Sequence, residues 1–263
     1  TKNLENIPFI QQTQEPELFF SKDSTNLYLY IKKKNTNRLE GFLGFASRED
    51  NSKLRVDGNL DLALTNNFNY GESINLLYKS NGDEQQTFNL NTRLPYIFKT
   101  PLSLSAQLNI FRQDSTFSNT TQGFGISYNI TSQTLLKLDY NFENSTTPTP
   151  LTSTEEFIKN RVDLGFQYNK RTSKSFFDNI ELIKIHTGIS QRQTENTVTQ
   201  FTIDIEAVKS INTSNNTQIH LKNKTHFLQS NSYLTNELER FGGVNTLRGF
   251  KENSISANTF SSI

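Results

Sequence analysis

The chain has 263 residues, a formal net charge of +1, 33% hydrophobic residues and a mean hydropathy of −0.62. The balanced charge argues against a nucleic-acid-binding protein, which would carry a basic surface. The 21 phenylalanines and 9 tyrosines argue against a disordered chain, and the lack of cysteine excludes disulfides and cysteine-ligated metals within this sequence. An antiparallel sheet with one apolar face and one wet face fits this composition, because only half of its strand residues need be apolar.

The first 35 residues differ from the rest of the chain. Asn26–Lys34, with the sequence NLYLYIKKK, predicts an amphipathic edge strand that ends in three lysines. The polar segment Asn35–Asn37 follows it and forms a natural boundary. We therefore expect one unit over residues 1–35 and a second unit over residues 36–263.

Alternation of apolar and polar residues predicts eleven strands after this boundary. In Lys53–Thr65, the positions from Leu54 to Leu64 in steps of two are apolar or glycine, and their neighbours are mostly polar. Successive side chains of a strand point to opposite faces, so such a strand has one oily and one wet side. The predicted strands are residues 38–47, 53–65, 71–80, 87–96, 102–110, 122–130, 136–143, 161–168, 180–191, 201–207 and 217–228. Many are about ten residues long, the length that a tilted strand needs to cross a bilayer.

Alternation alone fits both a soluble β-sandwich and a membrane β-barrel. Three features favour the barrel: the strands follow one another as hairpins, their lengths are uniform, and many end in an aromatic residue such as Tyr96 or Tyr168. The compact connections at residues 66–71, 95–101 and 129–133 predict periplasmic turns, and the long polar connection 144–155 predicts an external loop. No stretch approaches the ~20 consecutive apolar residues of a membrane helix.

The polar faces of the predicted strands carry charges of both signs, which indicates a solvated lumen whose charges compensate one another. These residues are Arg55, Asp57, Asp61, Lys79, Arg93, Lys137, Asp139, Arg161, Asp163, Lys184, Asp204, Glu206, Lys222 and Lys224. His186, His220 and His226 also fall on polar positions, but no carboxylate spacing turns them into a metal site. GxSxG, Walker and HExxH motifs are absent from the sequence, and Glu155–Glu156 lies in a polar connection. We expect no enzyme, no cofactor and no metal.

Phe241–Phe250, with the sequence FGGVNTLRGF, is the most distinctive segment. Its two glycines followed by Arg-Gly-Phe resemble the loop motif of the outer-membrane barrels that insert or export other proteins, the superfamily of BamA, TamA and the two-partner-secretion transporters. Residues 38–45 resemble the passage from the last POTRA domain into the first barrel strand of that family, and residues 64–72 resemble its first periplasmic turn. The family places the loop after strand eleven, and eleven predicted strands precede it here.

The resemblance implies an all-β fold, an antiparallel transmembrane β-barrel. This chain would supply the first eleven of sixteen strands and enter the twelfth, with the loop at residues 241–250. Residues 1–35 would be the end of a POTRA-like periplasmic domain. Since eleven strands leave open edges, we expect the protein to continue beyond both ends of this sequence.

The resemblance also implies two sites. In the first, the loop folds into the lumen, Arg248 anchors it to wall residues beyond the end of this sequence, and Phe250 packs beside the anchor. Arginine suits this role because its planar fork of donors can pin a loop against a carboxylate, and Gly242, Gly243 and Gly249 permit the backbone to turn. The alternative is that Arg248 is an ordinary loop cation.

The second implied site is a lateral seam on the first barrel strand, formed by residues that share that strand. They are Leu39, Gly41, Phe42, Leu43 and Gly44. A seam that opens sideways exposes backbone groups that can pair with a substrate strand. Gly41 and Gly44 would weaken the strand locally, or they make room for neighbouring side chains.

The function implied by the resemblance is an assembly factor that folds and inserts β-barrel proteins through the seam. It would lie in the outer membrane of a Gram-negative bacterium, with its N-terminal part in the periplasm. Its expected partners are outer-membrane lipids, unfolded outer-membrane proteins and periplasmic accessory lipoproteins, and not nucleic acid. The alternatives are a secretion pore for one exported partner, a passive porin and a soluble β-sandwich binding module.

Overall fold

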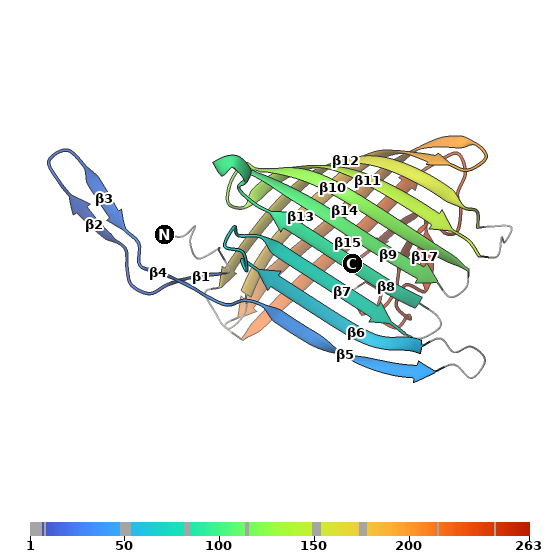
Figure 1. Ribbon diagram of the computed structural model, residues 1–263, viewed down its shortest axis with the longest axis horizontal. Coiled ribbons are helices and arrows are strands. Elements are labelled where there is room, and N and C mark those ends of the chain that lie inside the picture. The colour runs from blue at the N-terminus through green and yellow to red at the C-terminus, as the bar shows by residue number, and fades with distance from the viewer. Residues whose placement is uncertain are drawn as a thin grey trace.

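The computed structural model describes residues 7, 9–47, 54–81, 85–113, 116–148, 154–173, 178–214, 216–244 and 246–263. Its main body is a twelve-stranded antiparallel sheet with the strand order β18-β15-β14-β13-β12-β11-β10-β9-β8-β7-β6-β5 (Figure 1). The strands are β5 (Arg38–Ser47), β6 (Leu54–Thr65), β7 (Ser73–Ser80), β8 (Gln85–Leu94), β9 (Leu102–Gln113), β10 (Phe117–Asn129), β11 (Thr134–Thr146), β12 (Phe157–Ser173), β13 (Asp178–Gln193), β14 (Thr197–Ser214), β15 (Thr217–Gln229) and β18 (Thr259–Ser262). The eleven strands predicted from alternation are confirmed, and β18 follows the loop as the twelfth.

The sheet curls into a trough with β5 and β18 at its two edges (Figure 1). A cavity of about 670 Å³ lies on the concave side, lined by Lys79 of β7 and also by His226 of β15. Strands from the two halves of the sheet therefore face one another across this space, which we call the lumen.

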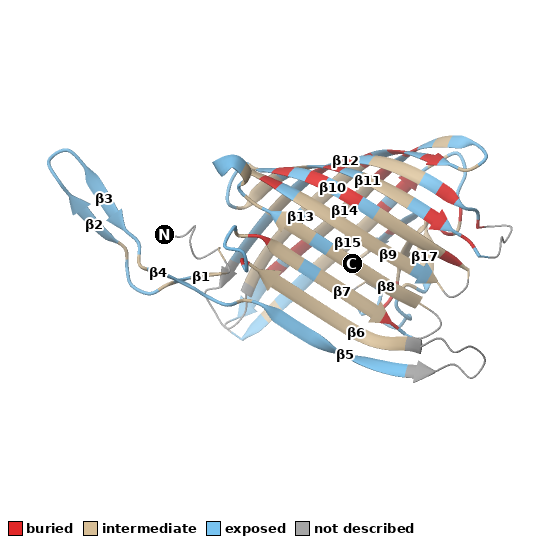
Figure 2. Cartoon of the chain, viewed as in Figure 1, coloured by how far each residue is buried: buried red, intermediate tan, exposed pale blue. Residues whose placement is uncertain are grey.

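The two faces of the sheet differ in polarity in the sense that the alternation predicts. On β12, Leu164 is 64% exposed while its neighbour Asp163 is 3% exposed, and on β13 Ile189 is 62% exposed while Ser190 is 2% exposed. Buried polar positions recur along the strands of the upper part of the sheet (Figure 2). Exposed apolar and buried polar residues are the reverse of a soluble core, and they fit a convex face that contacts lipid.

Compact turns close the hairpins at the end of the sheet where the N-terminal segment joins (Figure 1). In the turn at residues 66–72, the carboxylate of Glu72 accepts hydrogen bonds from the N–H groups of Phe68 at 2.7 Å and Tyr70 at 3.1 Å. Burial opposes ionisation of this carboxyl group, but the backbone donors outweigh it and lower the pKa of Glu72 below its usual value. The next turn contains the 3₁₀ helix η1 (Ile97–Lys99), which leaves Phe98 90% exposed.

The N-terminal segment consists of two short antiparallel pairs. Strand β1 (Ile10–Gln12) pairs with β4 (Ile31–Lys33), and β2 (Glu17–Phe20) pairs with β3 (Thr25–Tyr28). The prediction of a single strand over Asn26–Lys34 is therefore wrong, because the chain breaks between β3 and β4. Between the two pairs, residues 13–16 face only residues 29–30, and Pro16 has no N–H to donate.

The boundary at Asn35–Asn37 is tied to the first turn of the sheet. The side chain of Asn37 accepts a hydrogen bond from the N–H of Thr65 at 2.9 Å and donates one to Asn67 at 2.8 Å. The ammonium group of Lys33 donates to Asn69 at 2.7 Å. The N-terminal hairpins are thus held against the end of the sheet by side-chain contacts and by the chain itself.

Candidate functional site

The connection from Ser230 to Asn258, between β15 and β18, folds into the lumen. Its stem is a short hairpin in which β16 (Glu239–Phe241) pairs with β17 (Ile255–Ala257). Residues on both sides of the stem line the luminal cavity together with strands β7 to β12, β14 and β15. We call residues 230–238 the mouth segment and residues 242–250 the tip.

The two glycines at the start of the tip are required by backbone geometry. Gly242 and Gly243 are buried and have φ values of +115° and +91°. A Cβ atom on Gly242 would lie 2.6 Å from the carbonyl oxygen of Lys251, because the two arms of the tip approach closely there. The N–H of Gly243 donates to the carbonyl of Leu247 at 3.0 Å, which closes the turn. These glycines therefore fix the path of the chain into the Arg-Gly-Phe segment.

Arg248, Gly249 and Phe250 lie at the exposed end of the tip. Phe250 is 53% exposed, and Gly249 has a φ of +92° with no atom within 4 Å of an added Cβ. Among the residues that the structure describes, no carboxylate lies within ion-pair distance of Arg248. The anchoring role of Arg248 therefore stays a prediction.

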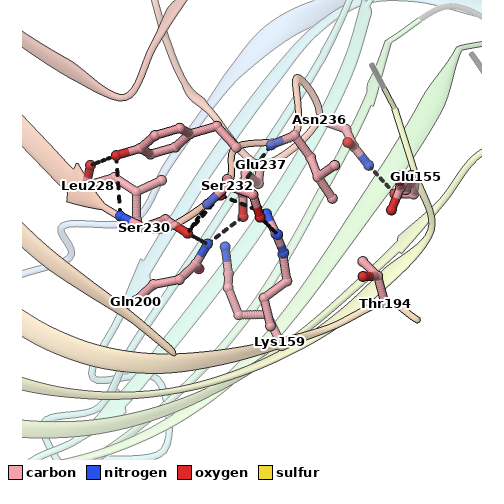
Figure 3. A network of polar contacts seen from close by, with 12 residues as sticks. Glu155, Lys159, Thr194, Gln200, Leu228, Ser230, Ser232, Asn236 and Glu237 are labelled. Carbon is pink, nitrogen blue, oxygen red and sulfur yellow. Dashed lines mark hydrogen bonds and ion pairs between the residues drawn. The ribbon is translucent and has the colours of Figure 1, made fainter. Parts of the chain in front are cut away.

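The contact that holds the mouth segment is a buried ion pair between Glu237 and Arg192 of β13. The side chains are 0% and 3% exposed, and the guanidinium also donates to the hydroxyl of Ser232 at 2.6 Å. Gln200 of β14 donates to the second carboxylate oxygen of Glu237 at 2.9 Å, and the N–H of Leu234 donates to the first at 2.9 Å. Figure 3 shows Glu237 at the centre of these contacts, above the barrel strands. Charge-assisted bonds of this kind are among the stronger polar contacts in proteins.

Asn236, which precedes Glu237, is bound to a different part of the wall. Its side-chain amide donates to the hydroxyl of Ser145 of β11 at 2.7 Å and to the carbonyl of Glu155 at 2.8 Å (Figure 3). Its own carbonyl accepts a hydrogen bond from Asn119 of β10 at 2.6 Å. The mouth segment is therefore connected to four strands, β10, β11, β13 and β14, at one end of the lumen.

Aromatic residues hold the stem of the loop. The guanidinium of Arg240 lies over the rings of Phe117 at 4.9 Å and Phe111 at 5.6 Å. Phe241 stacks on Phe260 of β18 with the ring centroids 4.2 Å apart. Both walls of the lumen thus contact the stem through flat side chains.

The residues that follow the tip contact β7 and β8. Glu252 forms an ion pair with Lys79 at 2.9 Å, and Gln85 donates to the carbonyl of Asn253 at 3.4 Å. The Lys79 and Glu252 side chains are 36% and 54% exposed, so this ion pair is much more hydrated than the pair at the mouth.

Charged residues on the inner face compensate one another, as predicted. Arg161 pairs with Asp163 at 2.6 Å and with Asp204 at 3.1 Å, and His226 lies 2.6 Å from Asp204. Lys184 and Glu206 form a further pair across β13 and β14 at 2.9 Å. Within the described ranges, no three His, Cys, Asp or Glu side chains are grouped so as to hold a metal ion.

The predicted seam residues all lie on β5, an edge strand of the sheet. Leu39, Phe42 and Leu43 are 68%, 72% and 41% exposed. Gly41 has a φ of +150°, and an added Cβ would collide with the carbonyl oxygen of Asn59 and lie 2.9 Å from Leu60 Cα, both on β6, whereas at Gly44 the nearest atom is 3.8 Å away. Close approach of the two backbones therefore requires glycine at position 41 and does not require it at position 44.

Glu237 and Arg192 are the site residues that sequence reasoning missed. The predicted strand 180–191 stops one residue before Arg192, whereas β13 continues to Gln193. Glu237 lies in an irregular segment where no periodicity assigns a face. A usable signal was the pair of inward-facing phenylalanines, Phe111 and Phe117, which interrupt the polar face where the loop packs.

None of the helices in the described part of the chain is long and apolar enough to cross a membrane. Residues 66–262, which are most of the chain, match the model of the Omp85 superfamily domain. No curated protein matches the chain.

Two solved structures resemble it in fold. BamA from Haemophilus ducreyi lacking POTRA domains 1–3 matches with 16% identity and a TM-score of 0.53, over 97% of this chain and 53% of that one. CdiB from Acinetobacter baumannii matches with 13% identity and a TM-score of 0.58, over 99% of this chain and 52% of that one. The chain spans about half the length of each.

Proposed function

The chain belongs to the Omp85 superfamily of outer-membrane transport and assembly proteins, which are not enzymes, and within it we propose a factor that folds and inserts β-barrel proteins. The observation that carries this proposal is the loop with the Gly242-Gly243 and Arg248-Gly249-Phe250 motif, which follows the eleventh strand of the sheet and folds into the lumen. The proposed location is the outer membrane of a Gram-negative bacterium. Residues 1–35 are proposed to be the end of a POTRA-like domain in the periplasm, with residues 36–263 as the N-terminal part of the barrel.

The proposed mechanism uses the edge of β5 as a template. A strand edge presents unpaired N–H and C=O groups, and these can pair with the first strand of an incoming unfolded barrel protein. Backbone pairing is independent of side-chain identity, so one seam can serve many substrates. The exposed side chains of Leu39 and Phe42 would contact lipid or the incoming strand, and no nucleotide or cofactor is required for such an exchange.

The luminal loop is proposed to support the wall opposite the seam. Arg248 would bind acidic or aromatic groups on the luminal wall, with Phe250 packed beside it. Arginine can do so because its charge persists at all physiological pH values and its donors form a planar fork. Unfolded outer-membrane proteins, outer-membrane lipids and periplasmic accessory lipoproteins are the proposed partners.

A secretion pore dedicated to one exported protein is the second candidate, because the same loop motif resembles that of two-partner-secretion transporters. Depletion of the protein in its host, followed by quantitative outer-membrane proteomics, separates the two. A joint loss of many unrelated barrel proteins supports the assembly factor. Accumulation of a single exported protein in the periplasm would support the secretion pore instead, and an unchanged proteome with impaired solute uptake would leave only a porin.

Substitution of Arg248 then tests the mechanism. Arg248→Ala is expected to reproduce the depletion phenotype while the protein remains folded and inserted. Lys99→Ala is the matched control, since Lys99 is an exposed cation on a turn at the other end of the sheet. Equal phenotypes for the two variants would contradict the anchoring role.

A further inference from the structure

We propose that Glu237, acting through Arg192, is a positioning residue that fixes the depth and direction of the tip in the lumen. The proposal rests on the function proposed for the tip, but it concerns a contact made wholly within this chain. It assigns the positioning of the loop to two anchors, the predicted one at Arg248 and a second one at the mouth.

The Arg192–Glu237 pair is buried. Carboxylate and guanidinium are both removed from water, and a buried charge is strongly unfavourable unless it is paired and hydrogen-bonded. The carboxylate has further donors in Gln200 and the N–H of Leu234, so its oxygens are satisfied from the wall and from the mouth segment itself. A displaced Glu237 would leave the buried guanidinium of Arg192 without a carboxylate, which makes other positions of the mouth segment unfavourable.

Glu237 is close in sequence to the tip. Leu238 and the stem strand β16 separate Glu237 from Gly242, and β16 is paired to β17, with Phe241 paired to Ile255. The stem is further held by the stacking of Phe241 on Phe260. A shift of Glu237 therefore moves the first glycine of the tip through a segment whose own hydrogen bonds keep it extended.

Two ion pairs of unequal burial connect the loop to the wall. The Lys79–Glu252 pair is half hydrated, and exposed pairs contribute little to stability. The Arg192–Glu237 pair has no such access to water, and loss of one partner from a buried pair is strongly unfavourable. The Arg192–Glu237 contact consequently determines where the loop lies, and the Lys79–Glu252 contact forms only when the loop is in that position.

The experiment measures the position of the tip directly in the full-length protein. Lys79→Cys and Glu252→Cys are introduced into a background without other cysteines, and the pair is joined with a short bismaleimide in purified outer membranes. The Lys79–Glu252 ion pair is then absent from every variant compared, so its loss cannot account for a difference between them. Glu237→Gln is compared with Glu181→Gln, which removes the ion pair between Glu181 and Lys209 on neighbouring strands β13 and β14.

Glu237→Gln is expected to lower the crosslinking rate by about tenfold or more, because a buried guanidinium is left without its carboxylate. Glu181→Gln is expected to keep most of the rate and Arg192→Lys an intermediate rate, because an ammonium group keeps the charge but not the planar fork of donors. All variants should retain the heat-dependent gel mobility of a folded barrel. An unchanged rate in Glu237→Gln overturns the proposal. Failure of both Glu237→Gln and Arg192→Lys to fold would also overturn it, since the pair would then be needed for the barrel and not for the loop.

The crosslinking rate does not depend on what the protein transports. A normal result for Glu237→Gln would therefore reject the positioning role and leave the proposed function intact. A reduced rate combined with an unaltered outer-membrane proteome would have the opposite meaning, with the loop positioned as proposed and the assembly function rejected.

Discussion

The strongest stability prediction concerns the close approach of β5 and β6 at the proposed seam. In Gly41→Ala, the new Cβ would lie 2.9 Å from Leu60 Cα, about 1 Å inside the usual carbon–carbon contact distance. The same close approach is found from the other strand, because a Cβ on Gly58 of β6 would lie 3.0 Å from the carbonyl carbon of Phe42 of β5. Backbone atoms cannot rotate away as a flexible side chain can, so the two strands must separate.

Separation by about 1 Å would break one or two backbone hydrogen bonds, each contributing about 1 kcal/mol. The φ of +150° at Gly41 adds strain of about 1–2 kcal/mol for any residue with a Cβ. The sum is about 2–4 kcal/mol, which corresponds to roughly 30-fold to 1000-fold in a local opening equilibrium. Gly44→Ala meets no close atom and should change stability by less than about 0.5 kcal/mol.

Amide hydrogen exchange of the protein in lipid bilayers measures this opening at the strand itself. Exchange across residues 39–45 should accelerate by the stated factor in Gly41→Ala and in Gly58→Ala, and it should remain unchanged in Gly44→Ala. The double variant at 41 and 58 should lower the stability of the strand pair by less than the sum of the two single variants, because either substitution alone already forces the two strands apart. Equal exchange rates in Gly41→Ala and Gly44→Ala would refute the reasoning.

Three further predictions concern the loop and the first turn. Arg192→Leu leaves the carboxylate of Glu237 buried and unpaired and should lower the free energy of unfolding by about 3–5 kcal/mol. Urea titration of the gel mobility measures this change. A loss below about 1 kcal/mol would mean that water reaches the site. The folded-state pKa of Glu72 lies below its unfolded value, so its contribution to the free energy of unfolding is complete above the unfolded pKa and is lost as pH falls through the folded pKa. Glu72→Gln should therefore lower the free energy of unfolding at pH 7, and the difference between variant and wild type should be smaller at pH 3 in the same titration. Gly242→Ala should raise the accessibility of the tip to protease more than Gly249→Ala, since an added Cβ meets the backbone at 242 and open space at 249; the reverse order would contradict the assigned close approach.

Alternation of apolar and polar residues predicted the strands because each strand has one face toward an apolar environment and one toward a polar environment. The predicted bounds were too short where both faces of a strand are exposed to water. The predicted strand 201–207 corresponds to β14, which runs from Thr197 to Ser214, and its last residues, Asn212 to Ser214, are polar and exposed on both faces. Backbone pairing with β15 continues there without any apolar signal, so the ladder extends beyond the pattern.

The loop was less accessible to sequence reasoning, because its contacts join residues that are far apart in the chain. Arg192 and Glu237 are 45 residues apart, and Asn119 and Asn236 are 117 apart. Nothing in local periodicity connects such positions. The glycine motif indicated a tight turn. The ion pair at the mouth could not be predicted in the same way, because it depends on which strand lies beside the loop in the folded sheet.

The unequal strength of the two ends of the loop has a consequence for the seam. The mouth segment is held by a buried ion pair on β13, whereas the tip side is held on β7 by a pair exposed to water. Strand β7 is two strands from the edge strand β5, and β13 lies six strands further into the sheet. A sideways movement of β5, β6 and β7 would therefore break the weak Lys79–Glu252 contact first and leave the loop attached to β13. We expect crosslinking between positions 79 and 252 to decrease when a substrate strand occupies the edge of β5, while Glu237 remains protected. Loss of the mouth contact under the same conditions would mean that the loop moves as a whole and that burial does not determine which end is released.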